Sequence, residues 1–416
     1  MPRKVQFPEG LRLESAFPMQ GRVSENEKYK TITRNYELVT PLFGGGVETR
    51  LADPVTTVRA SEIKGQLRFW WRAVCGWRAE GKLEKLLELE ESIWGGVTRR
   101  KSASKVHLVL EIVDHGQDKK PFELVPGKNF PKNLAHIAPG YLAFPLQPTK
   151  RDRTIYPVRT GVRFKLTLTF PKSYKKDVVA ALWAWETFGG VGGRTRRGFG
   201  AVVREGSKLP SLERIKKKLE LFIQGDAWPN GVPHLHPDGL FYLFSGSWQE
   251  LAEAYKNFRQ WRDGPRGRSK WPEPDEIRRL VGTHSPGHEP RHPVRKFPRG
   301  QFGLPIVFHF KDEKRDPKDK KHREPPDSTL KGETLERLAS PLGFKPLSKK
   351  GPVLVYVLEG NRRLPEPYVL EVGGRTFNVE VLLDKDEALK IEPLKEAGGE
   401  PDPVKAFIKW LKKGGR

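Results

Sequence analysis

The segment GGVGGRTRRGFG, residues 189–200, holds six glycines and three arginines. It follows an aromatic-rich stretch with helical spacing and precedes the strand-like run 201–204. Glycine allows positive φ angles and close approach of the backbone to a ligand, and the planar guanidinium group of arginine matches phosphate oxygens. The sequence therefore predicts a loop that contacts an anion through its backbone and its arginines. The candidate residues are Gly190, Gly192, Gly193, Arg194, Arg196, Arg197, Gly198 and Gly200.

Six predicted elements place this loop within one folding unit. The strands alternate apolar and polar residues, and the helices repeat apolar residues at spacings of three and four. Their order, strand–helix–strand–strand–helix–strand, is typical of the ferredoxin-like (RRM-like) fold, an antiparallel sheet with both helices on one face. The loop then joins the second helix to the last strand. In chain order the elements are 31–40, 62–77, 106–113, 162–170, 177–188 and 199–204.

The second half repeats this α+β character, with a domain boundary expected near residue 225. We predict an N-terminal ferredoxin-like domain, 1–225, and a C-terminal ferredoxin-like domain with insertions, 226–416. Long loop insertions are expected at 121–157 and 311–331, where proline, lysine and turn residues gather. The C-terminal elements are predicted as strands 239–244, 302–310, 353–359 and 368–372 and helices 248–262, 275–281 and 403–413.

The charge of the chain points to a polyanionic partner. Lysine and arginine number 76 against 51 aspartate and glutamate, which gives a net charge of +25 over 416 residues. A surplus of this size favours nucleic acid ahead of a membrane surface. The alternative is a solvated basic surface without a specific ligand. The 11 tryptophans, and arginines gathered beside glycines and aromatics, favour nucleic acid.

The helix 62–77 carries a second basic segment. Lys64, Arg68 and Arg72 follow one another at single-turn spacing, and Trp71 lies beside them. Within the helix no acidic residue four positions away neutralises this row. RNA contact and an ordinary charged face of a core helix both remain open for these four residues. Ser61 is the expected N-cap of the helix.

Nucleotide-binding and catalytic motifs are not recognised. Phe199 stands where a Walker loop requires Lys-Ser/Thr, and Thr195 occupies the third glycine position of the dinucleotide fingerprint. No histidine precedes His107, so no Ser–His–Asp or Cys–His set is recognised. Prolines interrupt the evenly spaced histidines of 284–292, which disfavours a metal site. We therefore expect no catalytic residues, no metal and no cofactor.

The number of cysteines indicates the redox environment of the protein. Cys75 is the single cysteine, so the chain forms no internal disulfide and no thiolate-based zinc site. This suits a reducing environment. No signal peptide and no apolar run of membrane-spanning length are recognised. We expect a cytoplasmic protein without a membrane partner.

The loop resembles the signature of a known family. Residues 190–200 follow the pattern Gly-apolar-Gly, then five residues that include a basic one, then Gly-apolar-Gly. This pattern looks like the signature loop of the RAMP superfamily of CRISPR-associated proteins. Further segments resemble the first-subunit family of the Cmr (type III-B) effector complex. They are TPLFGGG at 40–46, IKGQLRFWWRA at 63–73, FGLPI at 302–306 and RLASPL at 337–342.

This resemblance implies a non-catalytic, RNA-binding subunit of a type III-B CRISPR complex. Such a subunit is expected at the head of the complex, near the 3′ end of the crRNA, where it contributes to assembly and target RNA capture. The partners implied are crRNA, target RNA and neighbouring RAMP subunits, with no DNA bound directly. The resemblance also implies two ferredoxin-like domains. The basic helix and the glycine loop carry over as Lys64, Arg68, Arg72, Arg194, Arg196 and Arg197.

Two alternatives stay open at this stage. A RAMP endoribonuclease that processes crRNA precursors would need a general base, often histidine, at the scissile 2′-hydroxyl. The absence of early histidines counts against this enzyme. A purely protein-binding subunit, whose charge merely tolerates nearby RNA, is the other alternative.

Overall fold

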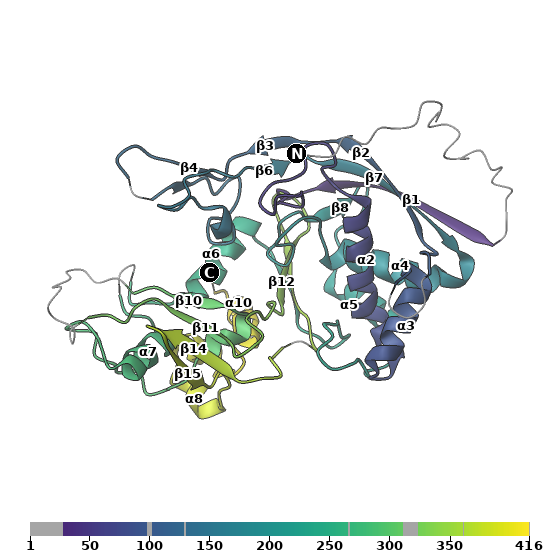
Figure 1. The fold of residues 1–416 in the computed structure, drawn as a ribbon. Coiled ribbons are helices and arrows are strands. Elements are labelled where there is room, and N and C mark those ends of the chain that lie inside the picture. The colour runs from purple at the N-terminus through teal and green to yellow at the C-terminus, as the bar shows by residue number, and fades with distance from the viewer. Residues whose placement is uncertain are drawn as a thin grey trace.

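The computed structural model shows a mixed α+β protein (Figure 1). Its first sheet has four strands in the spatial order β2-β7-β1-β8, and all neighbouring strands are antiparallel. This is the order expected of a βαββαβ unit, so the ferredoxin-like prediction for the first sheet is confirmed. The strands are β1 (Tyr29–Leu38), β2 (His107–Asp114), β7 (Arg163–Pro171) and β8 (Val202–Arg204). The structure describes residues 28–97, 102–128, 130–264, 267–310, 323–360 and 362–415.

Both helices of this unit cover one face of the sheet (Figure 1). They are α2 (Ala60–Cys75) and α4 (Lys175–Phe188), and they pack against each other. Alternate residues of β7, such as Phe164 and Phe170, are buried beneath the helices. On the opposite face, the hydroxyl groups of Thr31 and Thr169 pair across β1 and β7 at 3.0 Å. The period of two along each strand therefore separates an apolar face from a polar one.

Three further parts complete the N-terminal half. A short α3 (Leu83–Trp94) follows α2. The predicted insertion loop 121–157 contains one small antiparallel pair, β4 with β5, and a second pair, β3 with β6, flanks it. α5 (Leu212–Phe222) lies just before the expected boundary near residue 225, in a stretch for which the sequence predicted no helix. The insertion strands are β3 (Gln117–Lys119), β4 (Phe122–Glu123), β5 (Lys132–Asn133) and β6 (Val158–Thr160).

The C-terminal half contains a smaller sheet with the order β12-β13-β9. Its helices are α6 (Trp248–Arg259) and α10 (Pro403–Lys412). This is the spatial order of the first three strands of a βαββαβ unit. Among the described residues no fourth strand pairs with this sheet, so a second complete ferredoxin-like sheet is not confirmed. The strands are β9 (Phe241–Phe244), β12 (Leu342–Pro346) and β13 (Val353–Val357).

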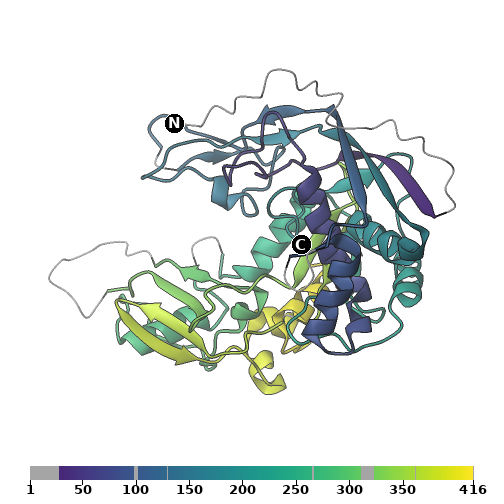
Figure 2. The ribbon, with the colours of Figure 1, turned by 45° about the vertical axis from the view of Figure 1, so that its right-hand side comes forward.

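Two insertions into this unit together form a separate four-stranded sheet, β10-β11-β14-β15. The first insertion lies between α6 and β12, and the second follows β13. The sequence predicted a loop at 311–331, but its last residues belong to β11. Residues 311–322 of the predicted loop lie outside the described residues. The elements are α7 (Glu273–Val281), β10 (Ile306–Phe308), β11 (Ser328–Gly332), β14 (Tyr368–Val372), β15 (Arg375–Val379), α8 (Lys385–Leu389) and α9 (Glu392–Glu396). Figure 2 shows this sheet and the β3–β6 insertion on the same side of the molecule.

The two halves share their hydrophobic cores. Leu354 and Tyr356 of β13 belong to the apolar cluster beneath the first sheet. Conversely, Phe43 and Phe199 of the N-terminal half belong to the cluster around α6 and α10. The hydroxyl group of Tyr356 donates to the carbonyl of Phe188, at the end of α4, over 2.9 Å. The boundary near 225 stays a prediction, but the parts on either side of it are packed into one another.

No helix within the described ranges has the length and apolar character needed to cross a membrane.

A buried lysine also joins the two halves. Lys345 of β12 donates to the carbonyls of Gly189, over 2.6 Å, and Val202, over 2.7 Å. Its side chain is fully buried, and this burial lowers its pKa to about 7, although nearby Glu186 acts in the opposite direction. In the unfolded chain the same group has the ordinary value of 10.5. Between these values the unfolded state binds more protons, so the free energy of unfolding rises with pH.

Lys345→Met should remove this pH dependence. From pH 7 to pH 9 we expect the free energy of unfolding of the wild type to rise relative to the variant, by up to about 1.4 kcal/mol per pH unit. Urea titrations at pH 7, 8 and 9 measure the difference. Lys350→Met, at an exposed lysine close in sequence, is the control and should follow the wild type. Parallel pH profiles for wild type and Lys345→Met would contradict the assignment.

Candidate nucleic-acid interface

The glycine–arginine loop, residues 189–200, folds back on itself between α4 and β8. The amide of Val191 donates to the carbonyl of Gly200 over 2.9 Å, and Gly190 forms a bridge with Ala201. Gly200 has φ +56°, and a Cβ there would lie 1.9 Å from the carbonyl oxygen of Val191. A Cβ at Gly190 would lie 2.6 Å from the carbonyl oxygen of Gly200. These two glycines therefore allow the loop to close upon its own backbone.

The remaining predicted glycines also lie against protein atoms. Gly192 and Gly193 pack on Phe43, in the loop after β1, where an added Cβ would approach within 3 Å. Gly198 packs on the indole ring of Trp248 with φ +86°. All five glycines of the prediction thus make close contacts with the chain itself.

Two of the three loop arginines bind the C-terminal half. Arg196 Nη1 donates to the carbonyl of Ser340 over 2.9 Å, and Arg197 Nη1 donates to the carbonyl of Leu342 over 2.8 Å. Between them, the amide of Phe344 in β12 donates to the carbonyl of Arg196 over 3.0 Å. We call this set of hydrogen bonds the loop–β12 contact.

Helix α6 completes the attachment of the loop. Trp248 Nε1 donates to the carbonyl of Arg197 over 2.9 Å, and its ring meets Phe199 edge-on at 4.9 Å. Arg197 also donates to the hydroxyl group of Tyr255 over 3.3 Å. The loop was predicted to bind an external anion, but many of its hydrogen-bonding groups are bonded to other parts of the protein.

Arg194 differs from its two neighbours. It has φ +57°, an unusual conformation for a residue with a Cβ, and its Nε is buried without a hydrogen-bond partner. Burial and the charge of Arg197 lower its pKa to about 10, so it remains charged at pH 7. Its guanidinium group lies 6.0 Å from the ring centre of Phe144, a side chain that is 62% exposed.

A further arginine, which the sequence did not single out, extends this positive region. Arg259 of α6 donates to the hydroxyl group of Tyr141 over 3.2 Å and lies over the ring of Tyr255 at 5.4 Å. Its Nε, like that of Arg194, is buried without a partner. Tyr141 belongs to the β3–β6 insertion, so three separate chain segments meet here. We call Arg194, Arg197, Arg259, Tyr141 and Tyr255 the Arg–Tyr cluster.

The charges of the Arg–Tyr cluster are not compensated by ion pairs. Among the described residues no carboxylate forms an ion pair with any of its three guanidinium groups, and the hydrogen bonds of Arg197 and Arg259 go to neutral oxygens. Their planar donors suit phosphate, and the exposed ring of Phe144 beside Arg194 suits a base, whereas Tyr255 is a buried core residue. The arrangement can therefore bind an anionic, aromatic polymer.

The basic row of α2 has a different environment. Arg68 Nε pairs with Glu90 of α3 over 2.5 Å, and Arg72 Nη1 pairs with the same carboxylate over 2.7 Å. Lys64 forms no ion pair among the described residues, and burial together with the charge of Arg68 lowers its pKa. The neutralising acid was not visible in the helical spacing because it comes from another helix.

Trp71 is a core residue and not a surface ring. It is 0% exposed, and its Nε1 donates to Asp177 of α4 over 2.8 Å. Its predicted availability to RNA bases is therefore wrong, because α4 covers the ring. Ser61 is likewise not the N-cap: α2 begins at Ala60, and the capping position is Arg59.

The loop and α2 do meet, through other residues. Glu62, in the first turn of α2, accepts a hydrogen bond from the amide of Gly192. Burial raises the pKa of Glu62, although the hydrogen bond from Gly192 and the charge of Arg59 act in the opposite direction, and its second carboxylate oxygen is buried without a partner. The guanidinium group of Arg196 lies 5.4 Å from the ring centre of Phe69. The structure thus brings the loop against Glu62 and Phe69, while Arg68 and Arg72 turn toward Glu90.

Alanine substitutions should show that Arg197 stabilises the fold more than Arg194 does. Arg197→Ala removes hydrogen bonds to Leu342 and Tyr255, so we expect a loss of about 2–3 kcal/mol in the free energy of unfolding. Arg194→Ala breaks no side-chain hydrogen bond to a described residue and should cost less than about 1 kcal/mol. Urea unfolding of both variants measures the two values. Equal losses would contradict the division of roles.

Comparison with known proteins finds a family match within the N-terminal half and relatives of similar sequence. Residues 35–203 match the model of the RAMP superfamily. The chain is 28% identical over 176 residues to the CRISPR system Cmr subunit Cmr1-2 of Pyrococcus furiosus, covering 40% of this chain and 90% of that protein. It is 31% identical over 158 residues to Cmr1-1 of the same organism, covering 36% of this chain and 42% of that protein.

Among solved structures, the crystal structure of apo Cmr1 from Pyrococcus furiosus aligns with a TM-score of 0.46 at 20% identity. That alignment covers 87% of this chain and 96% of the other. Residues 35–203 therefore carry a match to the RAMP superfamily, and parts of the chain are similar in sequence to the Cmr1 subunits of Pyrococcus furiosus.

Proposed function

We propose that this protein is a non-catalytic, RNA-binding subunit of a type III-B CRISPR (Cmr) complex. In this role it lies at the head of the complex, near the 3′ end of the crRNA, and contributes to assembly and target RNA capture. Kinship with proteins named as Cmr1 subunits supports membership of the complex. The observation that carries RNA binding is the Arg–Tyr cluster, whose three cations have no carboxylate partner among the described residues.

The surroundings of the cluster suit a single-stranded polyanion. Arg194 offers its guanidinium group beside the exposed ring of Phe144, which is a phosphate contact next to a stacking surface. The flanking segments come from the β3–β6 insertion, the glycine–arginine loop and α6. A strand bound here would contact both halves of the protein at once. Guide RNA and target RNA present the same chemistry at this position.

The same cluster is poorly suited to cleave RNA. Its charged members are arginines, which remain protonated near pH 7 and so cannot accept a proton. Strand cleavage at a 2′-hydroxyl needs a general base with a pKa near the working pH. We therefore assign RNA binding, and not RNA cleavage, to these side chains.

Arg194 should contribute one phosphate contact to RNA binding. For single strands each neutralised phosphate contributes about −0.7 to the slope of log affinity against log salt. Arg194→Ala should flatten that slope by roughly 0.7, measured by fluorescence anisotropy of a labelled 20-nucleotide RNA over a potassium chloride series. Arg68→Ala is the matched control, because Arg68 is paired with Glu90, and it should leave the slope unchanged.

If Arg68→Ala flattened the salt slope as much as Arg194→Ala does, the result would place RNA contacts on α2 and contradict the assignment to Arg194. A wild-type protein that binds no RNA even at low salt would overturn the RNA-binding role itself.

Absence of nuclease activity is the second expectation. Incubation of the purified chain with CRISPR repeat RNA in EDTA should give no discrete fragments on a denaturing gel. Discrete cleavage that persists after repeated purification would favour the endoribonuclease alternative.

A further inference from the structure

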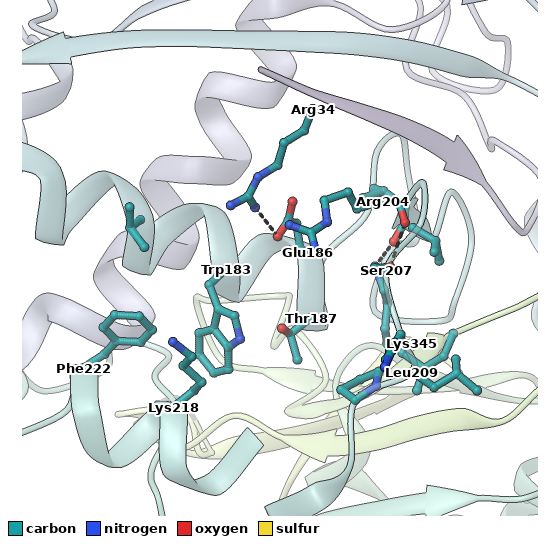
Figure 3. Close-up of a pocket in the computed structure, with 16 residues that line it drawn as sticks. Arg34, Trp183, Glu186, Thr187, Arg204, Ser207, Leu209, Lys218, Phe222 and Lys345 are labelled. Atoms are coloured by element: carbon teal, nitrogen blue, oxygen red, sulfur yellow. Dashed lines mark hydrogen bonds and ion pairs between the residues drawn. The ribbon is translucent and has the colours of Figure 1, made fainter. Parts of the chain in front are cut away.

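A second positively charged site lies away from the Arg–Tyr cluster, on the outer side of α4. A cavity of about 300 Å³ opens between α4, β8, the turn that follows β8, and α5 (Figure 3). Lys345 of β12 and Leu347, directly after this strand, form its floor. Its volume is at the lower end of the range of about 300–1,000 Å³ that holds small ligands.

Cations outnumber acids in the wall of this cavity. Arg34, Arg204, Lys208, Lys218 and Lys345 line it, with Glu186 as the single carboxylate. Glu186 already accepts hydrogen bonds from Arg34, over 2.5 Å, and from the hydroxyl group of Tyr36, over 2.6 Å. Three of the cations, Arg204, Lys208 and Lys218, form no ion pair among the residues that the structure describes. The cavity therefore holds uncompensated positive charge.

The floor of the cavity offers a buried donor. Lys345 Nζ uses two of its three hydrogens for the carbonyls of Gly189 and Val202. The third hydrogen has no partner among the described residues. Because burial lowers the pKa of Lys345 to about 7, the amine carries this third hydrogen at neutral pH only in part, and an acceptor in the cavity would stabilise the protonated form.

One wall of the cavity is aromatic. The half-buried indole of Trp183 lines it and packs on Phe222 with ring centres 5.3 Å apart. The indole Nε1 donates to no described residue. Lys218 Nζ lies 5.8 Å from the ring centre of Phe222, at the same wall (Figure 3). A flat apolar surface thus stands beside the cations.

We propose that this cavity binds one nucleoside monophosphate unit, with the base against Trp183 and the phosphate held by Arg204, Lys208 and Lys218. A group that combines an anion with a flat ring satisfies both walls, whereas inorganic phosphate would leave the indole uncovered. The unit can come from a free mononucleotide or from the terminal nucleotide of an RNA strand. This site is separate from the Arg–Tyr cluster and does not depend on the function proposed for that cluster.

Isothermal titration with AMP tests the site in the full chain. We expect saturable binding that weakens about tenfold in Trp183→Ala, from lost stacking, and at least several-fold in Lys218→Gln. Lys217→Gln is the matched control on the same helix: Lys217 pairs with exposed Glu213, does not line the cavity, and should bind AMP as the wild type does. Arg194→Ala should also bind AMP normally, which separates this site from the Arg–Tyr cluster.

Competition identifies the source of the nucleotide. A ten-nucleotide RNA that displaces AMP from Arg194→Ala protein would show that the cavity takes a strand end. AMP binding that such an RNA does not displace would show a free mononucleotide. Three results would overturn the proposal: no AMP or RNA binding at millimolar ligand, equal AMP affinity in Lys217→Gln and Lys218→Gln, or inorganic phosphate binding as tightly as AMP. Circular dichroism confirms that each variant is folded.

Discussion

The loop–β12 contact is the interaction on which the rest of the structure depends. Through it, backbone carbonyls of the C-terminal half accept hydrogen bonds from the guanidinium groups of Arg196 and Arg197. The same contact aligns β12 so that Lys345 reaches Gly189, where the loop begins, and Val202 of β8, just after the loop ends. Without it, the aromatic residues of both halves would lose the surfaces against which they pack. The glycine content of the loop is therefore first a requirement of its own folding.

Guanidinium groups bound to neutral oxygens keep their full charge. A carboxylate partner, such as Glu90 provides for Arg68 and Arg72, cancels the field of the cation and occupies its donors. A carbonyl or a tyrosine hydroxyl holds the side chain in place without cancelling its field. The interface between the halves thus positions several cations rigidly and leaves them attractive to an anion, which is the pre-organisation that tight binding requires.

Strong local patterns were readable from the sequence, and partners distant in the chain were not. The alternation in β1 and β7 and the spacing of α2 and α4 were sufficient to predict the first sheet and its helices. Trp71 illustrates the limit, because its burial depends on Asp177, a residue of the next long helix. Arg259 was not singled out since its role arises only when α6 meets the β3–β6 insertion. β12 was missed because Leu342–Pro346 is buried on both faces and lacks alternation.

The order of synthesis gives the loop–β12 contact a further consequence. Arg196 and its partner Ser340 are separated by 144 positions, so the loop leaves the ribosome well before its acceptors exist. N-terminal segments fold first during translation, and contacts of long sequence separation form late. Until β12 arrives, the nascent N-terminal half carries unattached arginines and the uncovered rings of Phe43 and Phe199. We therefore expect the nascent chain to be most prone to aggregation in this interval of biosynthesis, and the arrival of the C-terminal half to cover these groups.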